Sequence, residues 1–310
     1  MTSRTLSSGD LTADRRAEYA RIFAKTGDWG AAVDLMEQAL EVTPFWAAGW
    51  FRLGEYREKA YVSGGARDAY ARALELDPED MFGAGLKLAL LGGAEVPRQP
   101  PSRYIERLFD DYAGRFETAL VERLDYVVPQ AMAALIAATG QTFRLAADLG
   151  CGTGLMGPEL RPLAQRLEGF DLSRNMLAKA AEKQLYDHLA QADLSLPAET
   201  SGLFGALPPH RADLVTAADV LMYLGDLENA FALMTQLAAP DALIAFSVED
   251  SGEADGFLLR DSLRYAHSEA HIRHLCARHG FDALQIRRLA IRKDGGKPIG
   301  GILFLTRGTG

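Results

Sequence analysis

One stretch in the middle of the chain restricts what this sequence can fold into. A short apolar run at 145–149 contains an acid, Asp148, and three glycines follow before a helix-like pattern begins: Gly150, Gly152 and Gly154. Glycine adopts left-handed backbone angles readily, and without a Cβ it lets a ligand lie against backbone amides at a helix start. The segment predicts a strand, a tight turn and a helix, with a ligand site at the turn.

Asp148 also limits which kind of ligand can bind at the turn. A carboxylate at this position repels a bare phosphate, so a ligand with a cationic end and a ribose suits the turn better. Gly152–Gly157 does satisfy the G-x-G-x-x-G pattern of dinucleotide sites. The expected strand ends near Leu149, however, and counting from Gly150 puts Leu155 where the third glycine belongs. The dinucleotide alternative is therefore weak.

Acids recur at the ends of the next expected strands. These strands cover residues 166–171, 189–194 and 212–218, and the acids are Asp171, Asp193 and, just after the last strand, Asp219. Asp171 lies about twenty residues past the glycine turn, the spacing at which a carboxylate accepts from ribose hydroxyls in a Rossmann-like fold. Each acid alone has an ordinary alternative as a loop or helix-cap residue.

The rest of the chain predicts an antiparallel end to the sheet. A buried strand is expected at 242–248, and a helix at 268–279 ends at Gly280. Two strands follow at 281–291 and 299–305, and the connecting residues 292–298 contain a Gly-Gly turn that joins antiparallel strands.

The motifs closely resemble those of class I S-adenosylmethionine-dependent methyltransferases. Asp-Leu-Gly-Cys-Gly-Thr-Gly at 148–154 is similar to the first motif of that family, and Asp-Leu-Ser-x-x-Met-Leu at 171–177 to the second. The resemblance implies an α/β fold with a Rossmann-like, seven-stranded, mostly parallel sheet and a C-terminal antiparallel hairpin. It also implies S-adenosyl-L-methionine as cofactor, held by Asp148, Gly150, Cys151, Gly152, Gly154, Asp171, Leu172, Met176, Asp193, Leu194 and Ala218.

Within that family, the roles of these residues are distinct. The glycine turn would seat the amino-acid part of the cofactor, Met176 would cover one adenine face, and Asp193 with Leu194 would hold the adenine edge. Cys151 is expected to be a small turn residue and no nucleophile.

The segment 104–116 has two interpretations. It resembles the F-D-x-Y-A-x-x-F segment that folds over the cofactor in many small-molecule methyltransferases, which implies that Tyr112 and Arg115 meet the cofactor's carboxylate end. Alternatively it is an amphipathic helix that buries residues such as Phe109 and Phe116, spaced by three and four. A helix at 124–138 follows in either case.

The first third of the chain repeats itself at an offset of 34 residues. Ala32 and Pro44, for example, recur as Ala66 and Pro78. The period and the large-then-small residue pattern are typical of tetratricopeptide (TPR) repeats. We therefore expect an all-α TPR-like domain over 1–96, with repeats at 13–46 and 47–80 and a capping helix at 80–92. A proline-rich linker with the lid and N-terminal helices then covers 97–140, and the methyltransferase domain covers 141–310.

A methyl acceptor is not identifiable from the sequence. A general base is required only where the acceptor arrives protonated, and the candidates are Tyr223, Asp219 and His267. The chain has Asp-Val-Leu-Met at 219–222 in place of the Asn-Pro-Pro-Tyr of amide and nucleobase N-methylation. An O or N of a small molecule or of a protein side chain is therefore expected. The alternative is a protein methyltransferase or a cofactor-sensing protein whose TPR segment recruits a partner or a second copy of the chain.

Composition narrows the partners further. A net charge of −9 and a pI near 5.3 disfavour nucleic acid. The segment 260–297 is a basic exception, which leaves an anionic substrate or an acidic partner open. The two cysteines and the lack of a long apolar run favour a cytoplasmic protein away from membranes. His267, His271 and His274 share helical spacing but lack the partners of a known metal motif, so no metal is expected.

Overall fold

A computed structural model describes residues 6–115, 125–252 and 254–308, except for the side chain of Arg115. The chain forms two compact units, Met1–Tyr104 and Ile105–Gly310. The division falls inside the segment 97–140 that the sequence analysis assigned to the linker and lid. Each unit is described by itself.

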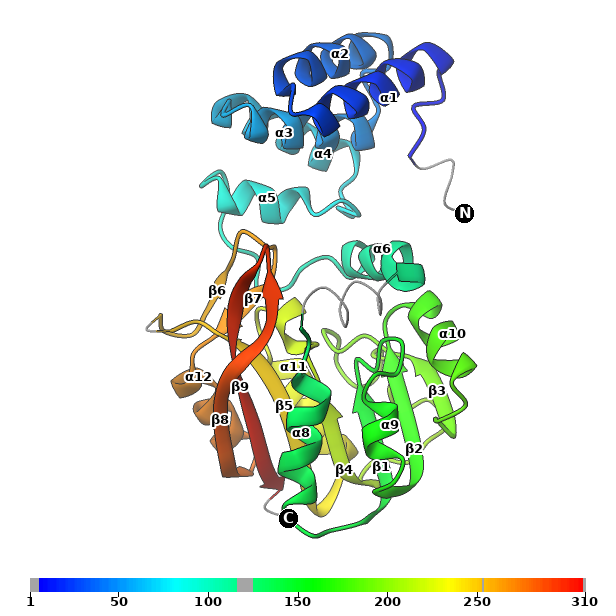
Figure 1. Cartoon of the computed structure of the whole chain (residues 1–310), viewed down its shortest axis with the longest axis vertical. Coiled ribbons are helices and arrows are strands. Elements are labelled where there is room, and N and C mark those ends of the chain that lie inside the picture. Colours follow the sequence, from blue (N-terminus) through cyan, green and yellow to red (C-terminus); the bar gives the residue numbers. More distant parts are fainter. Residues whose placement is uncertain (1–5, 116–124, 253, 309–310) are drawn as a thin grey trace. The chain divides into compact units, whose positions relative to one another are not determined.

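The N-terminal unit is built from helices that follow one another through short turns (Figure 1). Asp10 caps the first helix because its Oδ1 accepts hydrogen bonds from the backbone amides of Thr12 and Ala13, at 2.7 and 2.9 Å. Gly27 ends that helix in the left-handed conformation, with φ of 85°. The helices are α1 (Leu11–Thr26), α2 (Trp29–Val42), α3 (Ala47–Lys59), α4 (Ser63–Leu76) and α5 (Ala84–Leu90).

Small residues set the close approach of α3 and α4. A Cβ on Gly54 would lie 2.5 Å from Cε1 of Tyr70, so only glycine leaves room for that ring. Tyr70 is fully buried, and its hydroxyl donates a short hydrogen bond to Glu58. Helices α1 and α2 cover most of the segment 13–46, α3 and α4 cover most of 47–80, and α5 lies within 80–92.

The second unit is an α/β domain around one sheet. Its parallel part has the order β3-β2-β1-β4-β5, and β9 pairs antiparallel with both β5 and β8. The strands are β1 (Phe143–Leu149), β2 (Ala164–Asp171), β3 (His188–Gln191), β4 (Ala212–Ala217), β5 (Ala238–Asp250), β6 (Phe257–Leu259), β7 (Tyr265–His267), β8 (Phe281–Asp294) and β9 (Lys297–Gly308).

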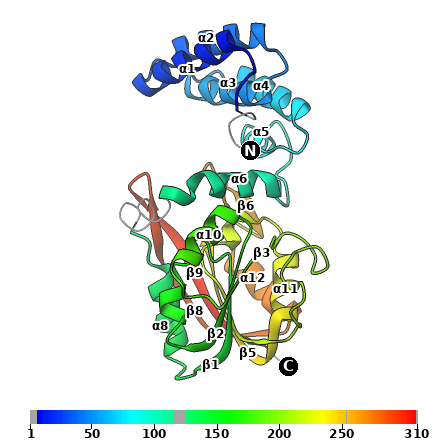
Figure 2. The same cartoon turned by 90° about the vertical axis from the view of Figure 1, so that its right-hand side faces the viewer.

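Helices cover both faces of this sheet, as the two views show (Figures 1 and 2). Along β5, Leu243 and Ala245 pack on one face while Ile244 and Phe246 pack on the other, because successive side chains of a strand point to opposite sides. The first face carries α8 (Val128–Ala137) and α9 (Gly157–Leu160), and the second carries α11 (Glu228–Leu237) and α12 (Glu269–Arg278). No helix in the described ranges is long and apolar enough to cross a bilayer.

The remaining short elements connect the strands of the second unit or precede them. They are α6 (Ser102–Tyr112), η1 (Ala113–Arg115), α10 (Arg174–Glu182) and η2 (Leu221–Tyr223).

The mostly parallel sheet with antiparallel C-terminal strands agrees with the prediction, and two details correct it. The described sheet has nine strands where seven were expected, because β6 and β7 form an additional hairpin beside the end of β5. The expected loop at 292–298 is a two-residue turn, since β8 runs to Asp294 and β9 begins at Lys297. Gly295 and Gly296 have φ of 54° and 80°, the left-handed values that a tight hairpin turn requires.

Candidate functional site

A cavity opens where β1, β2 and β4 end. It holds about 710 Å³ of atom-free space, part of it open to solvent. Nine residues that the sequence analysis assigned to the site line it: Asp148, Gly150, Cys151, Gly152, Asp171, Met176, Ala218, Asp219 and Tyr223. The rest of its described lining is Phe109, Tyr126, Pro129, Leu155, Met156, Val220, Arg264 and Arg292.

The glycine turn forms the floor of this cavity. Gly150 and Gly152 have φ of 66° and 55°, in the left-handed region. A Cβ on Gly150 would lie 2.3 Å from Cγ2 of Val220, so the backbone of the turn from β1 packs directly against the Val220 side chain in the loop after β4.

Asp171, the last residue of β2, forms hydrogen bonds with both the glycine turn and the loop after β2. Its Oδ2 accepts from the amide of Gly152 at 2.9 Å, and its Oδ1 accepts from the amide of Ser173 at 2.8 Å. Burial raises the pKa of Asp171 to about 6, and the two amide donors oppose that rise. Ser173 in turn caps α10, since its hydroxyl accepts from the amide of Met176 at 3.1 Å.

Asp148 is more deeply buried, with 1% of its surface exposed. The hydroxyl of Tyr186 donates to its Oδ2 at 2.7 Å, and that of Thr216 donates to its Oδ1 at 2.9 Å. Burial raises the pKa of Asp148 to about 7, against the effect of these donors. Burial also raises the pKa of Cys151 well above its usual range, so this thiol stays protonated.

The helix before the first motif, α6, closes one side of the cavity. Phe109 lines the cavity and packs edge-on against Tyr223, with ring centroids 4.8 Å apart. Asp110 accepts from the Ser173 hydroxyl at 2.5 Å, which fastens α6 to the loop after β2. Tyr112 is half-buried and is not among the described lining residues. The predicted contacts of Arg115 and Phe116 concern side chains outside the described residues.

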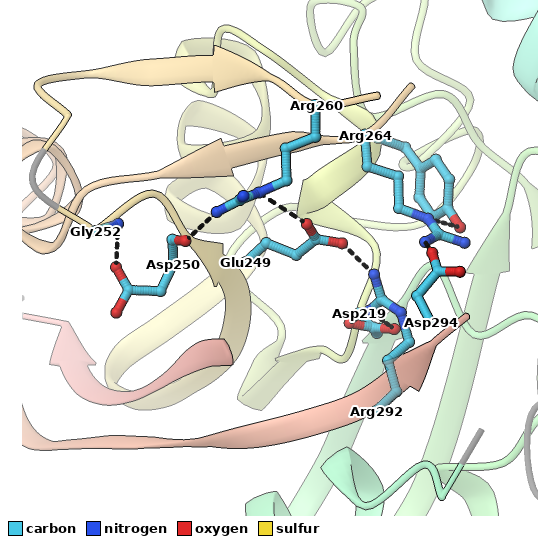
Figure 3. A network of polar contacts seen from close by, with 9 residues as sticks. Asp219, Glu249, Asp250, Gly252, Arg260, Arg264, Arg292 and Asp294 are labelled. Carbon is cyan, nitrogen blue, oxygen red and sulfur yellow. Dashed lines mark hydrogen bonds and ion pairs between the residues drawn. The ribbon is translucent and has the colours of Figure 1, made fainter. Parts of the chain in front are cut away.

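An ion-pair network around Arg292 forms another part of the cavity wall (Figure 3). Nη1 of Arg292 donates to both carboxylate oxygens of Asp219, at 2.9 and 2.8 Å, and its Nη2 donates to Glu249. Asp219 has φ of 57°, and its backbone amide donates to the Ser247 hydroxyl at 2.8 Å. This left-handed conformation is uncommon for a residue with a side chain and is held here by the surrounding contacts.

Arg264 reaches the cavity from the loop just before β7. Its Nε donates to the Tyr223 hydroxyl at 3.3 Å, and its guanidinium lies 5.9 Å from the centre of that ring. Its Nη1 lies 3.1 Å from Oδ2 of Asp294 at the end of β8. Neither Arg264 nor Arg292 was predicted to be a site residue from the sequence. The basic composition of 260–297 was the available signal for both.

Several predicted site residues lie away from the described lining. They are Leu172, Gly154, Asp193, Leu194 and His267. A Cβ on Gly154 would lie 2.9 Å from Cε2 of Tyr186, so this glycine makes room for a protein side chain. Asp193 accepts from the amide and hydroxyl of Ser195, at 2.8 and 2.6 Å, and Leu194 belongs to the core.

His267 does not reach the cavity either. It is fully buried in β7, and its Nε2 lies 3.0 Å from the carbonyl oxygen of Leu224. Burial lowers the pKa of His267 to about 4. The structure thus places this candidate base behind the cavity wall, in a neutral form.

Comparisons with known proteins find similarity to methyltransferases. The chain is 26% identical over 133 residues to a malonyl-[acyl-carrier protein] O-methyltransferase of Salmonella typhimurium, covering 43% of this chain and 49% of that one. It is 30% identical over 127 residues to a ubiquinone biosynthesis O-methyltransferase of Methylococcus capsulatus, covering 41% and 52%. The chain thus spans about half the length of the curated relatives it matches.

A solved structure is similar to part of the chain. The N-methyltransferase NodS of Bradyrhizobium japonicum, in complex with S-adenosyl-L-homocysteine, superposes with a TM-score of 0.43 at 18% identity, over 58% of this chain and 85% of that one.

The family described as "Methyltransferase domain" matches residues 126–290, which is more than half of the 310-residue chain and includes every strand from β1 to β7. The chain belongs to this methyltransferase domain family.

Proposed function

We propose that this protein is an S-adenosyl-L-methionine-dependent methyltransferase that acts on an oxygen or nitrogen of a small-molecule acceptor. The observation that carries the proposal is the pair of buried acids beside the glycine turn. Among the described residues, neither Asp148 nor Asp171 has a cationic partner. A ligand with a positive centre and ribose hydroxyls would satisfy these buried carboxylates, whereas a phosphate would be repelled.

The roles of the cavity residues follow from this assignment. Asp171 would accept from the ribose hydroxyls, Met176 would cover the adenine, and the turn at Gly150 and Gly152 would seat the amino-acid end. The cofactor supplies a methyl group on a sulfonium, which is a good leaving group. The protein's task is then chiefly to align the acceptor, and alignment alone can lower a barrier by several kcal/mol.

The named relatives favour oxygen over nitrogen as the acceptor atom. The two curated relatives described above are both named as O-methyltransferases. Asp193 and Leu194 remain the predicted adenine contacts, since both follow β3 at the same edge of the sheet.

The N-terminal unit is proposed to be a TPR-like pair of helical hairpins. The supporting observations are the 34-residue repeat and the glycine at the crossing of α3 and α4, where Tyr70 packs against Gly54. Recruitment of a protein partner or of a second copy through this unit stays a prediction.

Calorimetry on the full chain tests the cofactor assignment. S-adenosyl-L-methionine should bind the wild type, and Asp171→Asn should weaken binding roughly 100-fold, because hydrogen bonds to a charged group contribute about 1.5–3 kcal/mol each. Asp282→Asn, an exposed acid on β8, is the matched control and should bind like the wild type. Equal affinities of Asp171→Asn and the wild type would show that the ribose assignment is wrong.

A further inference from the structure

The cavity has two chemically different ends. Asp171 ends β2 and Met176 follows it, on one side of β1 in the sheet, whereas Tyr223 and Arg264 belong to the side of β4, β5 and β7. If the first end holds the cofactor, as proposed above, the second end faces the acceptor. That end combines the aromatic rings of Phe109, Tyr126 and Tyr223 with the two guanidinium groups of Arg264 and Arg292.

The two arginines differ in how their charge is balanced. Arg292 has 1% of its side chain exposed and is held by the carboxylates of Asp219 and Glu249, whose side chains are 11% and 2% exposed. Its charge is therefore neutralised inside the protein. Arg292 therefore forms part of the cavity wall, and it is not the residue we expect to bind an anionic ligand.

Arg264 lacks such a buried partner in the described part of the chain. The carboxylate that it contacts there is that of Asp294, whose side chain is 47% exposed at the tip of the β8–β9 hairpin. Ion pairs with an exposed partner contribute about 1 kcal/mol or less. The guanidinium of Arg264 can therefore exchange this contact for an anionic ligand at little cost, and its planar donors suit a carboxylate.

The candidate bases point to an acceptor that is already ionised. Both oxygens of Asp219 accept hydrogen bonds from the Arg292 guanidinium, and His267 lies outside the described cavity lining with Nε2 facing a backbone carbonyl. The Tyr223 hydroxyl accepts from Arg264. An alcohol or phenol would need one of these groups to remove its proton, whereas a carboxylate has no proton to lose.

We propose that the acceptor is a small-molecule carboxylate, that Arg264 binds this carboxylate, and that the product is its methyl ester. In the reaction, a carboxylate oxygen lone pair forms the new O–CH₃ bond. The S–CH₃ bond breaks, and its electron pair stays on sulfur, so the sulfonium becomes a neutral thioether. The negative charge of the acceptor and the positive charge of the sulfonium cancel, and no proton is released. This inference rests on the proposed function.

The alkali stability of the product tests the carboxylate proposal independently of the cofactor assignment. The purified full chain is incubated with S-adenosyl-L-[methyl-³H]methionine and a small-molecule extract of bacterial cells. The products are then treated with dilute alkali. Methyl esters hydrolyse to volatile [³H]methanol, whereas methyl ethers and methylamines keep their label. We expect most of the transferred label to become volatile.

Substitutions of Arg264 test whether this residue binds the acceptor carboxylate. Arg264→Gln should lower kcat/KM for the labelled product about 10- to 100-fold, mostly through KM, because it loses a charge-assisted contact to the substrate. Arg264→Lys should recover part of the loss. Arg287→Gln, which removes the same charge from an exposed position on β8, should behave like the wild type. All three variants should bind S-adenosyl-L-methionine with wild-type affinity.

Each outcome bears on one proposal. Alkali-stable label, label found only in the protein fraction, or no transfer by a chain that binds the cofactor would each overturn the carboxylate inference. An Arg264→Gln variant with unchanged KM would remove Arg264 from it. Failure of the wild type to bind S-adenosyl-L-methionine would instead refute the proposed function, because the product assay depends on that binding.

Discussion

The buried network around Arg292 should make a large contribution to the stability of the second unit. Replacing Arg292 with Met keeps most of the side-chain volume but leaves the carboxylates of Asp219 and Glu249 without their main partner. Breaking a buried ion pair by removing one member costs about 3–5 kcal/mol, because the remaining charge stays desolvated. With a urea m-value of roughly 2 kcal/mol/M for a unit of this size, the midpoint should fall by roughly 1.5–2.5 M.

The chain carries separate probes for its two units. All three tryptophans, at positions 29, 46 and 50, belong to the N-terminal unit, so tryptophan fluorescence follows that unit. Both cysteines, Cys151 and Cys276, are buried in the second unit. Pulsed thiol labelling during urea titration therefore reports unfolding of the second unit alone.

Matched variants distinguish the effect of removing a buried arginine from the effect of removing any arginine. Arg288→Met removes a guanidinium from the same strand, where the side chain is 59% exposed, and should cost about 1 kcal/mol or less. Adding Asp219→Asn and Glu249→Gln to Arg292→Met should restore part of the stability, since no buried charge is then left unpaired. A thiol-labelling midpoint that falls by less than about 0.5 M in Arg292→Met, or as far in Arg288→Met, would refute the reasoning. So would an equal shift of the tryptophan transition.

Two further predictions concern glycines. Gly150→Ala should abolish cofactor binding and cost about 2–4 kcal/mol in the second unit, because it combines a left-handed φ with a close contact. Gly205 also has a left-handed φ, but no atom lies within 4 Å of where its Cβ would be. Gly205→Ala therefore measures the cost of the left-handed φ without the close contact. Gly54→Ala should lower the stability read by tryptophan fluorescence by about 1–3 kcal/mol through its clash with Tyr70. Gly64→Ala, in an open helix position, should raise that stability by about 0.5–1 kcal/mol, and the opposite order would contradict the packing argument.

The features that the sequence predicted best are local. The strand, turn and helix around Asp148 and Gly150 depend on residues that are neighbours in the chain, and so does the position of Asp171 at the end of β2. Because the carboxyl ends of parallel strands meet at one edge of a sheet, the sequence alone was enough to place the separate motifs together. Nine of the predicted residues line one cavity for this reason.

The position of Arg292 was missed because of a β-bulge. In a regular strand, neighbours point to opposite faces, so burial of Ile291 would expose Arg292. The pairing of β8 with β9 shifts between Ala290 and Arg292, and Ile291 and Arg292 are both buried. Bulges turn a side chain toward a new direction, frequently beside a functional site. The sequence around 292–298 has turn-forming residues, which favoured a loop there.

Arg264 and Tyr186 were missed for a different reason. Tyr186 meets Asp148, which lies 38 positions earlier, and Arg264 meets Tyr223, which lies 41 positions earlier. Such contacts depend on how strands are ordered in the sheet, and the basic composition around Arg264 does not show which residue it meets. The extra β6–β7 hairpin also places His267 in a strand, where its ring is buried, rather than at a helix start beside the cavity.

The raised pKa of Asp148 connects folding with cofactor binding. In the folded protein this carboxyl holds its proton up to a pKa of about 7, against 3.8 as its ordinary value. The folded state thus binds more protons than the unfolded state between these values, and stability falls as pH rises through that range. A ligand with a positive centre at the cavity needs the ionised form, so its affinity should fall as pH is lowered below 7.

Asp148→Asn should change stability and cofactor affinity in opposite directions. Asp148→Asn removes the buried charge, and at pH 8 the ligand-free variant should unfold at a higher temperature than the wild type. The same variant should lose most of its affinity for S-adenosyl-L-methionine. Between pH 8 and pH 6 the wild-type affinity should fall roughly tenfold, as expected for a group that ionises near 7, while Asp148→Asn should lack this part of the pH dependence. Calorimetry at both pH values measures it. Parallel pH profiles of the two proteins would mean that Asp148 does not sense the cofactor's charge, and its burial would then need a purely structural explanation.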